Sequence, residues 1–87
     1  MSDHRIVGIH VTNRAENAGD VQGILGRHAH LIRTRLGLHD VDQSHASPHG
    51  LILLDTVGPE QEIEQMSNEL RRLPGIQVQS MFFSHPE

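Results

Sequence analysis

The segment RTRLGLHDVDQSHASPHGLILLDTVG, residues 33–58, decides how the chain folds. Residues 31–39 alternate as in a strand between two sets of side chains: Ile32, Thr34, Leu36 and Leu38 in one, and Arg33, Arg35, Gly37 and His39 in the other. Residues 50–57 form a mostly apolar run, typical of a strand buried on both faces. The polar residues 40–49 contain the turn signal Ser47-Pro48 and predict a long hairpin loop.

The segments on either side of this hairpin predict a strand and a helix each. Residues 5–12 alternate like a strand, and the helix after them carries an i, i+3, i+4, i+7 stripe: Val21, Ile24, Leu25 and His28. A second helix opens at Gly58-Pro59, with proline at its first position, and ends at Pro74-Gly75. Its stripe is Ile63, Met66, Leu70 and Leu73. Residues 76–83 alternate again as a last strand.

The order β-α-β-β-α-β predicts an α+β, ferredoxin-like fold, in which a four-stranded antiparallel sheet carries both helices on one face. Right-handed crossovers place the first and third strands in the centre. We expect one domain over residues 5–83, with short tails at residues 1–4 and 84–87.

Composition narrows the class of protein. The chain has 87 residues, 36% of them apolar, and its only aromatic residues are Phe82 and Phe83. Such a small core favours a homo-oligomer that buries further surface. The net charge of -4 and the sparse arginines argue against autonomous nucleic-acid binding. Without cysteine, a signal-peptide pattern or an 18-residue apolar run, we expect a cytoplasmic protein without disulfides or membrane contact.

The face of the sheet opposite the helices must meet water or a partner. If the more apolar set of each strand faces the helices, the open face carries these residues: Ile6, Gly8, His10, Arg33, Arg35, Gly37, His39, Leu51, Leu53, Asp55, Gln77, Gln79, Met81 and Phe83. The apolar members predict association through this face. The glycines Gly8 and Gly37 would permit close approach of a ligand or backbone, and His10 and Asp55 could pair across the central strands.

The motifs Arg35-Leu36-Gly37-Leu38, SPHGLILLDTVG and LRRLPGIQVQSMFF resemble the small iron-only hydrogenase system regulator family. That family has an ACT-like domain similar to the C-terminal domain of nickel-responsive regulators. The resemblance, over residues 5–83, implies a regulatory or ligand-sensing module that assembles into dimers or tetramers. We expect no autonomous DNA binding, because residues 1–4 are too few for the DNA-binding segment of the nickel regulators. Their nickel site also needs a cysteine, which this chain lacks.

Several residues are candidates for binding. Arg33 and Arg35 could hold a carboxylate or phosphate, or pair with acids at a subunit interface. By analogy with ACT-like domains, the first strand-to-helix loop could hold a small ligand through Thr12 and Asn13. A helix-capping role is favoured for these two residues. His28 continues an apolar stripe and is expected to be a packed histidine.

Two alternatives stay open. Imidazole is a common ligand of transition metals, so His39, His45 and His49 could bind Ni or Zn, or belong to a solvated loop. A small dimeric ferredoxin-like enzyme is the other alternative, although the chain has neither a phosphate-binding loop nor a nucleophile-base signature. The sequence therefore favours a non-enzymatic, homo-oligomeric sensing module, with a small-molecule ligand as its other partner.

Overall fold

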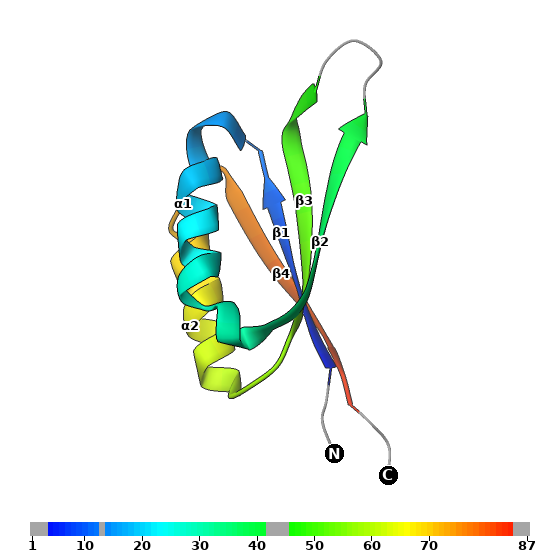
Figure 1. Cartoon of the computed structure of the whole chain (residues 1–87), viewed down its shortest axis with the longest axis vertical. Coiled ribbons are helices and arrows are strands. Elements are labelled where there is room, and N and C mark those ends of the chain that lie inside the picture. Colours follow the sequence, from blue (N-terminus) through cyan, green and yellow to red (C-terminus); the bar gives the residue numbers. More distant parts are fainter. Residues whose placement is uncertain (1–3, 13, 42–45, 85–87) are drawn as a thin grey trace.

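The computed structural model describes residues 4–12, 14–41 and 46–84, and its elements follow the predicted order (Figure 1). The strands are β1 (His4–Val11), β2 (Ile32–Val41), β3 (Ala46–Thr56) and β4 (Ile76–Phe83). The helices are α1 (Arg14–Arg27) and α2 (Glu60–Arg71), and a short 3-10 turn, Ala29–Leu31, links α1 to β2. The predicted ferredoxin-like α+β fold is confirmed.

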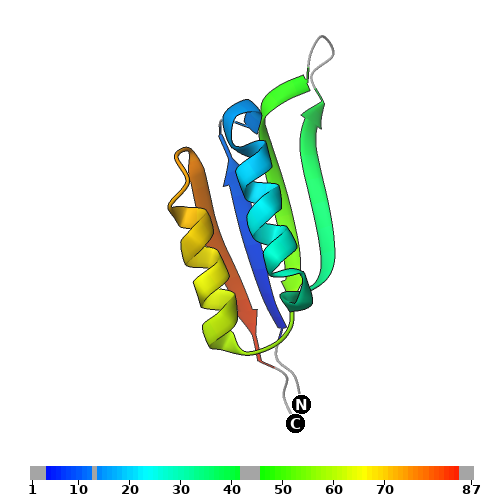
Figure 2. The same ribbon diagram turned by 60° about the vertical axis from the view of Figure 1, so that its left-hand side comes forward.

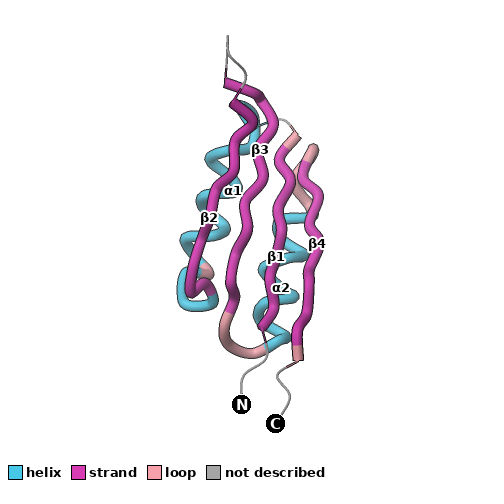
Figure 3. The backbone as a smooth tube through the Cα atoms, turned by 90° about the vertical axis from the view of Figure 1, so that its right-hand side faces the viewer, coloured by secondary structure: helices cyan, strands magenta, loops and turns pink. Residues whose placement is uncertain are grey.

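The sheet has the order β2-β3-β1-β4, and each neighbouring pair of strands is antiparallel. The first and third strands are therefore central, as the handedness of the crossovers predicts. Both helices cover one face of the sheet (Figure 2). The view from the other side shows the four strands in front of the helices, with this second face free of any helix (Figure 3).

The hydrophobic core lies between the sheet and the two helices. On β1 the alternate residues Val7, Ile9 and Val11 are buried, and both predicted helical stripes pack against them: Val21, Ile24 and Leu25 from α1, and Ile63, Met66 and Leu70 from α2. Leu73 packs at the margin of this core. Each fully buried side chain of this size contributes about 1.5–3 kcal/mol. The spacing of apolar residues thus predicts the core correctly in both helices and in β1.

The start of α2 depends on a glycine. Gly58 has φ 107°, a conformation that side chains rarely adopt, and a Cβ atom there would lie 3.0 Å from Cδ2 of Leu31. The sequence predicted Pro59 at the first position of the helix. In the structure Pro59 is the N-cap residue, one position earlier. Because Pro59 offers no side-chain cap, the acidic Glu60 and Glu62 are the groups that complement the helix dipole in the first turn.

The central hairpin is longer than the sequence predicted. Residues 40–41 and 46–49, expected in a loop, belong to β2 and β3, and only residues 42–45 lie between the strands, outside the described residues. Strand β3 pairs with β1 only as far as Gly50, which lies opposite Val11. Residues 46–49 therefore extend beyond β1 (Figure 1), and Pro48 does not interrupt the ladder between the central strands.

A β-bulge at the start of β2 turns that strand over. Ile32 lies opposite Thr56, but Thr34 lies opposite Asp55, so Arg33 is an extra residue. One extra residue moves every later side chain to the other face of a sheet. The prediction that Thr34, Leu36 and Leu38 face the helices with Ile32 is therefore wrong.

The register of β2 with β3 and the exposure of the β2 side chains both show that β2 has its faces reversed. Leu36 and Leu38 lie opposite Leu53 and Leu51 on the open face, and their side chains are 53% and 42% exposed. Arg35 and Gly37, expected on the open face, share the helix side with their register partners, Leu54 and Ile52. Nη2 of Arg35 donates a hydrogen bond of 2.6 Å to Oε1 of Gln22 on α1. His39 lies opposite Gly50, and its side chain is outside the described part of the chain.

Candidate functional site: the open face of the sheet

The open face, the side of the sheet opposite the helices, carries an apolar strip across all four strands. Its members are Leu36 and Leu38 from β2, Leu51 and Leu53 from β3, Ile6 from β1, and Met81 and Phe83 from β4. Met81 and Phe83 are each more than half exposed. Because the bulge brings two leucines to this face in place of Arg35 and Gly37, the face is more apolar than the sequence alone predicted.

A hollow of about 300 Å³ lies in the middle of this strip, around Gly8. Gly8 lies opposite Leu53 on one side and Gln79 on the other. A Cβ atom there would lie 3.6 Å from Cδ2 of Leu53 and 3.8 Å from the carbonyl oxygen of Gln79, which are ordinary contacts. The missing side chain therefore leaves space rather than relieving a clash.

The hollow has an apolar wall and a polar end. Ile6, Leu51, Leu53 and Met81 form the apolar part of the lining, and His10, Gln77 and Gln79 supply its imidazole and carboxamide groups. His10 lies directly opposite Gln77 in the pairing of β1 with β4. A largely apolar concave surface with a few polar groups is the usual character of a small-molecule site.

A charged cluster lies at the other end of the same face. Asp55 has Nδ1 of His4 at 3.7 Å and Nη1 of Arg33 at 3.8 Å. Its Oδ1 atom is buried and accepts no hydrogen bond from the described residues. Asp55 lies opposite Ile6, whereas His10 lies opposite Leu51, four residues away along β3. The predicted pairing of His10 with Asp55 is therefore wrong.

The structure describes only some of the remaining predicted site residues. The hydroxyl of Thr12 donates a 2.6 Å hydrogen bond to the carbonyl of Gly75, so it ties the end of β1 to the turn before β4. Asn13 and His45 lie outside the described residues, as do the side chains of His39 and His49. Ligand binding by these residues stays a prediction.

The predicted metal site also stays a prediction. Among the side chains that the structure describes, which do not include those of His39, His45 and His49, no three His, Asp or Glu groups are placed so that they could hold a metal ion. In the pairing of β2 with β3, His39 lies opposite Gly50, the residue after His49. The two histidines are therefore on adjacent strands.

Ion pairs across the helix layer were not predicted from the sequence. Glu69 of α2 receives a 2.9 Å hydrogen bond from Nη2 of Arg27, and Nε2 of His28 lies 3.2 Å from its other oxygen. Nε2 of His30 lies 3.0 Å from Oε1 of Glu62. The Arg27 guanidinium, with His28 beside it, holds the pKa of Glu69 below its usual value. His28 is thus mostly buried and hydrogen-bonded, as its place in the stripe predicted.

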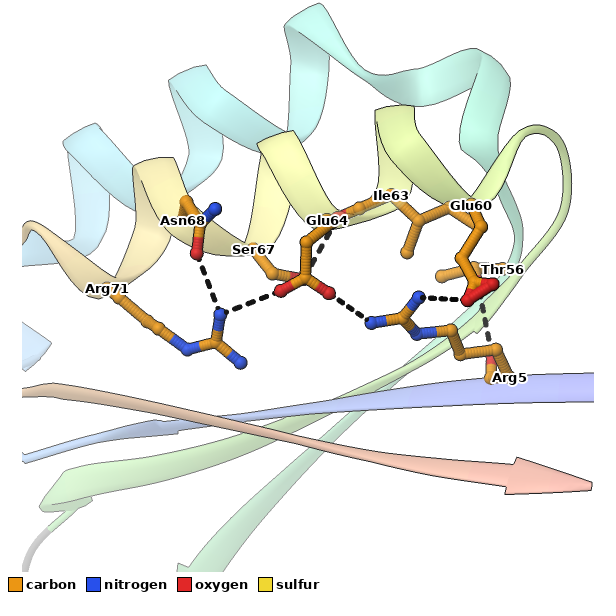
Figure 4. A network of polar contacts seen from close by, with 8 residues as sticks. All are labelled: Arg5, Thr56, Glu60, Ile63, Glu64, Ser67, Asn68 and Arg71. Carbon is orange, nitrogen blue, oxygen red and sulfur yellow. Dashed lines mark hydrogen bonds and ion pairs between the residues drawn. The ribbon is translucent and has the colours of Figure 1, made fainter.

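A second polar network joins α2 to β1 (Figure 4). Glu64 accepts a 2.6 Å hydrogen bond from Nη2 of Arg5 and a 3.2 Å hydrogen bond from Nη1 of Arg71. Arg71 also donates to Oδ1 of Asn68 at 2.9 Å, and Oε1 of Glu60 lies 3.8 Å from Arg5. The hydrogen bond from Arg5, and to a smaller extent the one from Arg71, lowers the pKa of Glu64. These contacts fix the flank of α2 that faces away from α1.

Comparison with known proteins gives structural neighbours but no family. No family model and no curated protein matches this chain. Among solved structures, the uncharacterized protein TM1266 from Thermotoga maritima matches with a TM-score of 0.80 at 20% identity, over 95% of this chain and 100% of that one. CPII, a nitrogen regulatory PII-like protein from Thiomonas intermedia K12 bound to ADP, AMP and bicarbonate, matches with a TM-score of 0.54 at 11% identity, over 99% and 98%.

These matches lie below 25% identity and therefore concern the fold. They do not support membership of the hydrogenase system regulator family that the sequence motifs resemble. Neither helix in the described part of the chain is long and apolar enough to cross a membrane. The chain has a ferredoxin-like fold, which it shares with TM1266 and with the PII-like protein CPII.

Proposed function

We propose that this chain is a non-enzymatic regulatory module that senses a small ligand and acts as a homo-oligomer, with the ligand or partner site at the subunit interface. The apolar open face carries the proposal. An exposed apolar patch of this kind on a small domain usually marks an interaction site. The hollow around Gly8 lies inside that patch, so a second copy packed on the face would close the hollow off from water.

The lining of the hollow favours binding over catalysis. One imidazole and two carboxamides, from His10, Gln77 and Gln79, can donate and accept hydrogen bonds to a ligand. The carboxylate on the same face, Asp55, is displaced from His10 by four register positions and interacts with His4 and Arg33. An acid-base pair across the hollow is therefore not formed by these two residues.

The structural neighbours suggest the first ligands to test. CPII was found with ADP, AMP and bicarbonate. A hollow of about 300 Å³ is at the small end of ligand pockets, and among the described residues its lining contains no arginine that could pair with phosphates. We expect adenine nucleotides to be bound with the phosphates outside the hollow.

The experiment combines sedimentation velocity at micromolar protein with calorimetric titration of ADP and AMP. Gly8→Val fills the hollow at a position where the added Cβ makes ordinary contacts, and Gly37→Val is the matched control on the helix side of β2, where a Cβ meets nothing within 4 Å. We expect Gly8→Val to weaken nucleotide binding at least about tenfold, which is 1.4 kcal/mol, and Gly37→Val to bind like the wild type. A monomeric wild type that binds neither nucleotide would overturn the proposal.

A further inference from the structure

The outer edge of β4 has none of the features that usually protect an edge strand. Strand β4, IQVQSMFF, is at the end of the sheet and contains no charged residue, proline or glycine. Its register with β1 runs without a shift from Val11 opposite Ile76 to His4 opposite Phe83. Natural proteins blunt exposed edges with charges, prolines, bulges or a short strand. A regular, uncharged edge of eight residues is therefore a template for another strand.

The opposite edge of the sheet shows the contrast. Strand β2 carries Arg33 and Arg35, has register shifts near both ends, and is tied to α1 through Gln22. These features disfavour pairing of β2 with a further strand. The two edges of the same sheet thus differ in the property that controls association.

The surroundings of the β4 edge are also suited to a partner. The flank of α2 on this side carries two carboxylates and two guanidinium groups, from Glu60, Glu64, Arg71 and the neighbouring Arg5, and these charges pair among themselves (Figure 4). A second copy approaching this flank would meet no net charge. Both aromatic residues of the chain, Phe82 and Phe83, end this strand and are more than half exposed.

We infer that β4 pairs antiparallel with β4 of a second copy about a twofold axis, giving one continuous eight-stranded sheet. The occupant is a second copy because an antiparallel pair of identical strands is self-complementary, and twofold dimers are the commonest assemblies. This inference rests on the proposed homo-oligomer and gives it an edge interface, separate from the packing of a second copy on the open face. Pairing at β4 joins the two open faces into one surface, with Met81 and Phe83 of both copies near its middle.

Twofold symmetry makes the pairing measurable. In such a pair a single residue of β4 faces its own copy, with Cα atoms about 5 Å apart, and the next residues along the strand are about 8 Å from their copies. A disulfide forms only when the Cα atoms are closer than about 7 Å. Because the chain has no cysteine, single-cysteine variants at each of residues 77–82, with Leu36→Cys on β2 as the control, report the axis directly.

The expected result under mild oxidation is strong dimer formation at one β4 position, little or none at its neighbours, and none at Leu36→Cys. Crosslinking confined to Leu36→Cys, or absent from all β4 positions, would overturn the inference.

A second measurement separates this interface from association through the open face. Ser80 is exposed on the helix side of β4, whereas Leu36 is exposed on the open face of β2. We expect Ser80→Lys to raise the dimer dissociation constant about tenfold or more, because a lysine on an edge strand disfavours pairing with another strand, and Leu36→Lys to leave it within a factor of about two. The reverse order would refute pairing at β4 and retain the proposed homo-oligomer. A wild type that is monomeric at all concentrations would refute both.

Discussion

Replacing Glu64 by glutamine should destabilise the fold, because Glu64 is the shared acceptor of two guanidinium groups. The Arg5 side chain is only 13% exposed, and it donates a 2.6 Å hydrogen bond to Glu64 of α2. A hydrogen bond to a charged group contributes about 1.5–3 kcal/mol in a buried setting. Glu64 is 46% exposed, so solvent screening reduces this figure, and we expect a loss of about 1 kcal/mol.

The matched control is Glu60→Gln. Glu60 is 70% exposed and lies 3.8 Å from the same Arg5, so its removal should cost less than about 0.5 kcal/mol. Urea unfolding followed by circular dichroism at one fixed protein concentration measures both variants, since an oligomer makes stability depend on concentration. A loss of 1 kcal/mol lowers Tm by about 4–8 °C in a domain of this size. Equal effects of the two substitutions, or no effect of Glu64→Gln, would refute this account of the network.

The pH dependence supplies an independent check on Glu64. Its pKa is lower in the folded chain than its ordinary value of 4.5, because Arg5 and Arg71 favour the carboxylate. Its contribution is therefore fully present above pH 4.5 and is lost as the pH falls through the lowered pKa of the folded state. The difference in unfolding free energy between wild type and Glu64→Gln should shrink over that acidic range. A difference that grows on acidification would contradict the assignment.

Two further predictions concern the turn before α2 and the histidines of the hairpin. Gly58→Ala should lower the free energy of unfolding by about 1–2 kcal/mol, since φ is 107° and the new Cβ would lie 3.0 Å from Leu31; Gly19→Ala, where a Cβ meets nothing within 4 Å, is the control in the same urea assay. If His39, His45 and His49 bind Ni²⁺ or Zn²⁺, the triple His→Ala variant should lose at least about tenfold in affinity by calorimetry. Equal affinity in wild type and variant would dispose of that site.

The sequence predicts the layers of this fold well, because layer formation depends on periodicity. Apolar stripes at helical spacing and alternation in β1 identify the core correctly, and chirality places β1 and β3 in the centre. Neither inference needs to know which residues face each other across the strands. Features that depend on that pairing, such as the separation of His10 from Asp55, could not be predicted from one chain.

The hairpin shows a different limit of prediction. Ser47-Pro48 looks like a turn because proline cannot donate to a ladder. Since β3 pairs with β1 only up to Gly50, the segment with Pro48 has no ladder on that side to interrupt. A turn signal in a sequence reports a local preference, and the length of the neighbouring strand decides whether it ends the strand.

The bulge at Arg33 decides which chemistry the open face presents. Without an extra residue, β2 would turn Arg35 outward and Leu36 inward, and the face would suit an anion. With it, Leu36 and Leu38 join Leu51 and Leu53 on that face, and Arg35 bonds to Gln22 on the helix side.

Any ligand bound by Arg35 would thus approach from the helix layer, whereas the open face selects an apolar partner. The alternation of apolar residues is the same in both registers, so the sequence contains no signal for the reversal. One extra residue in β2 thus makes the open face apolar instead of anion-binding. Association through this face and the hollow around Gly8 both depend on that apolar character.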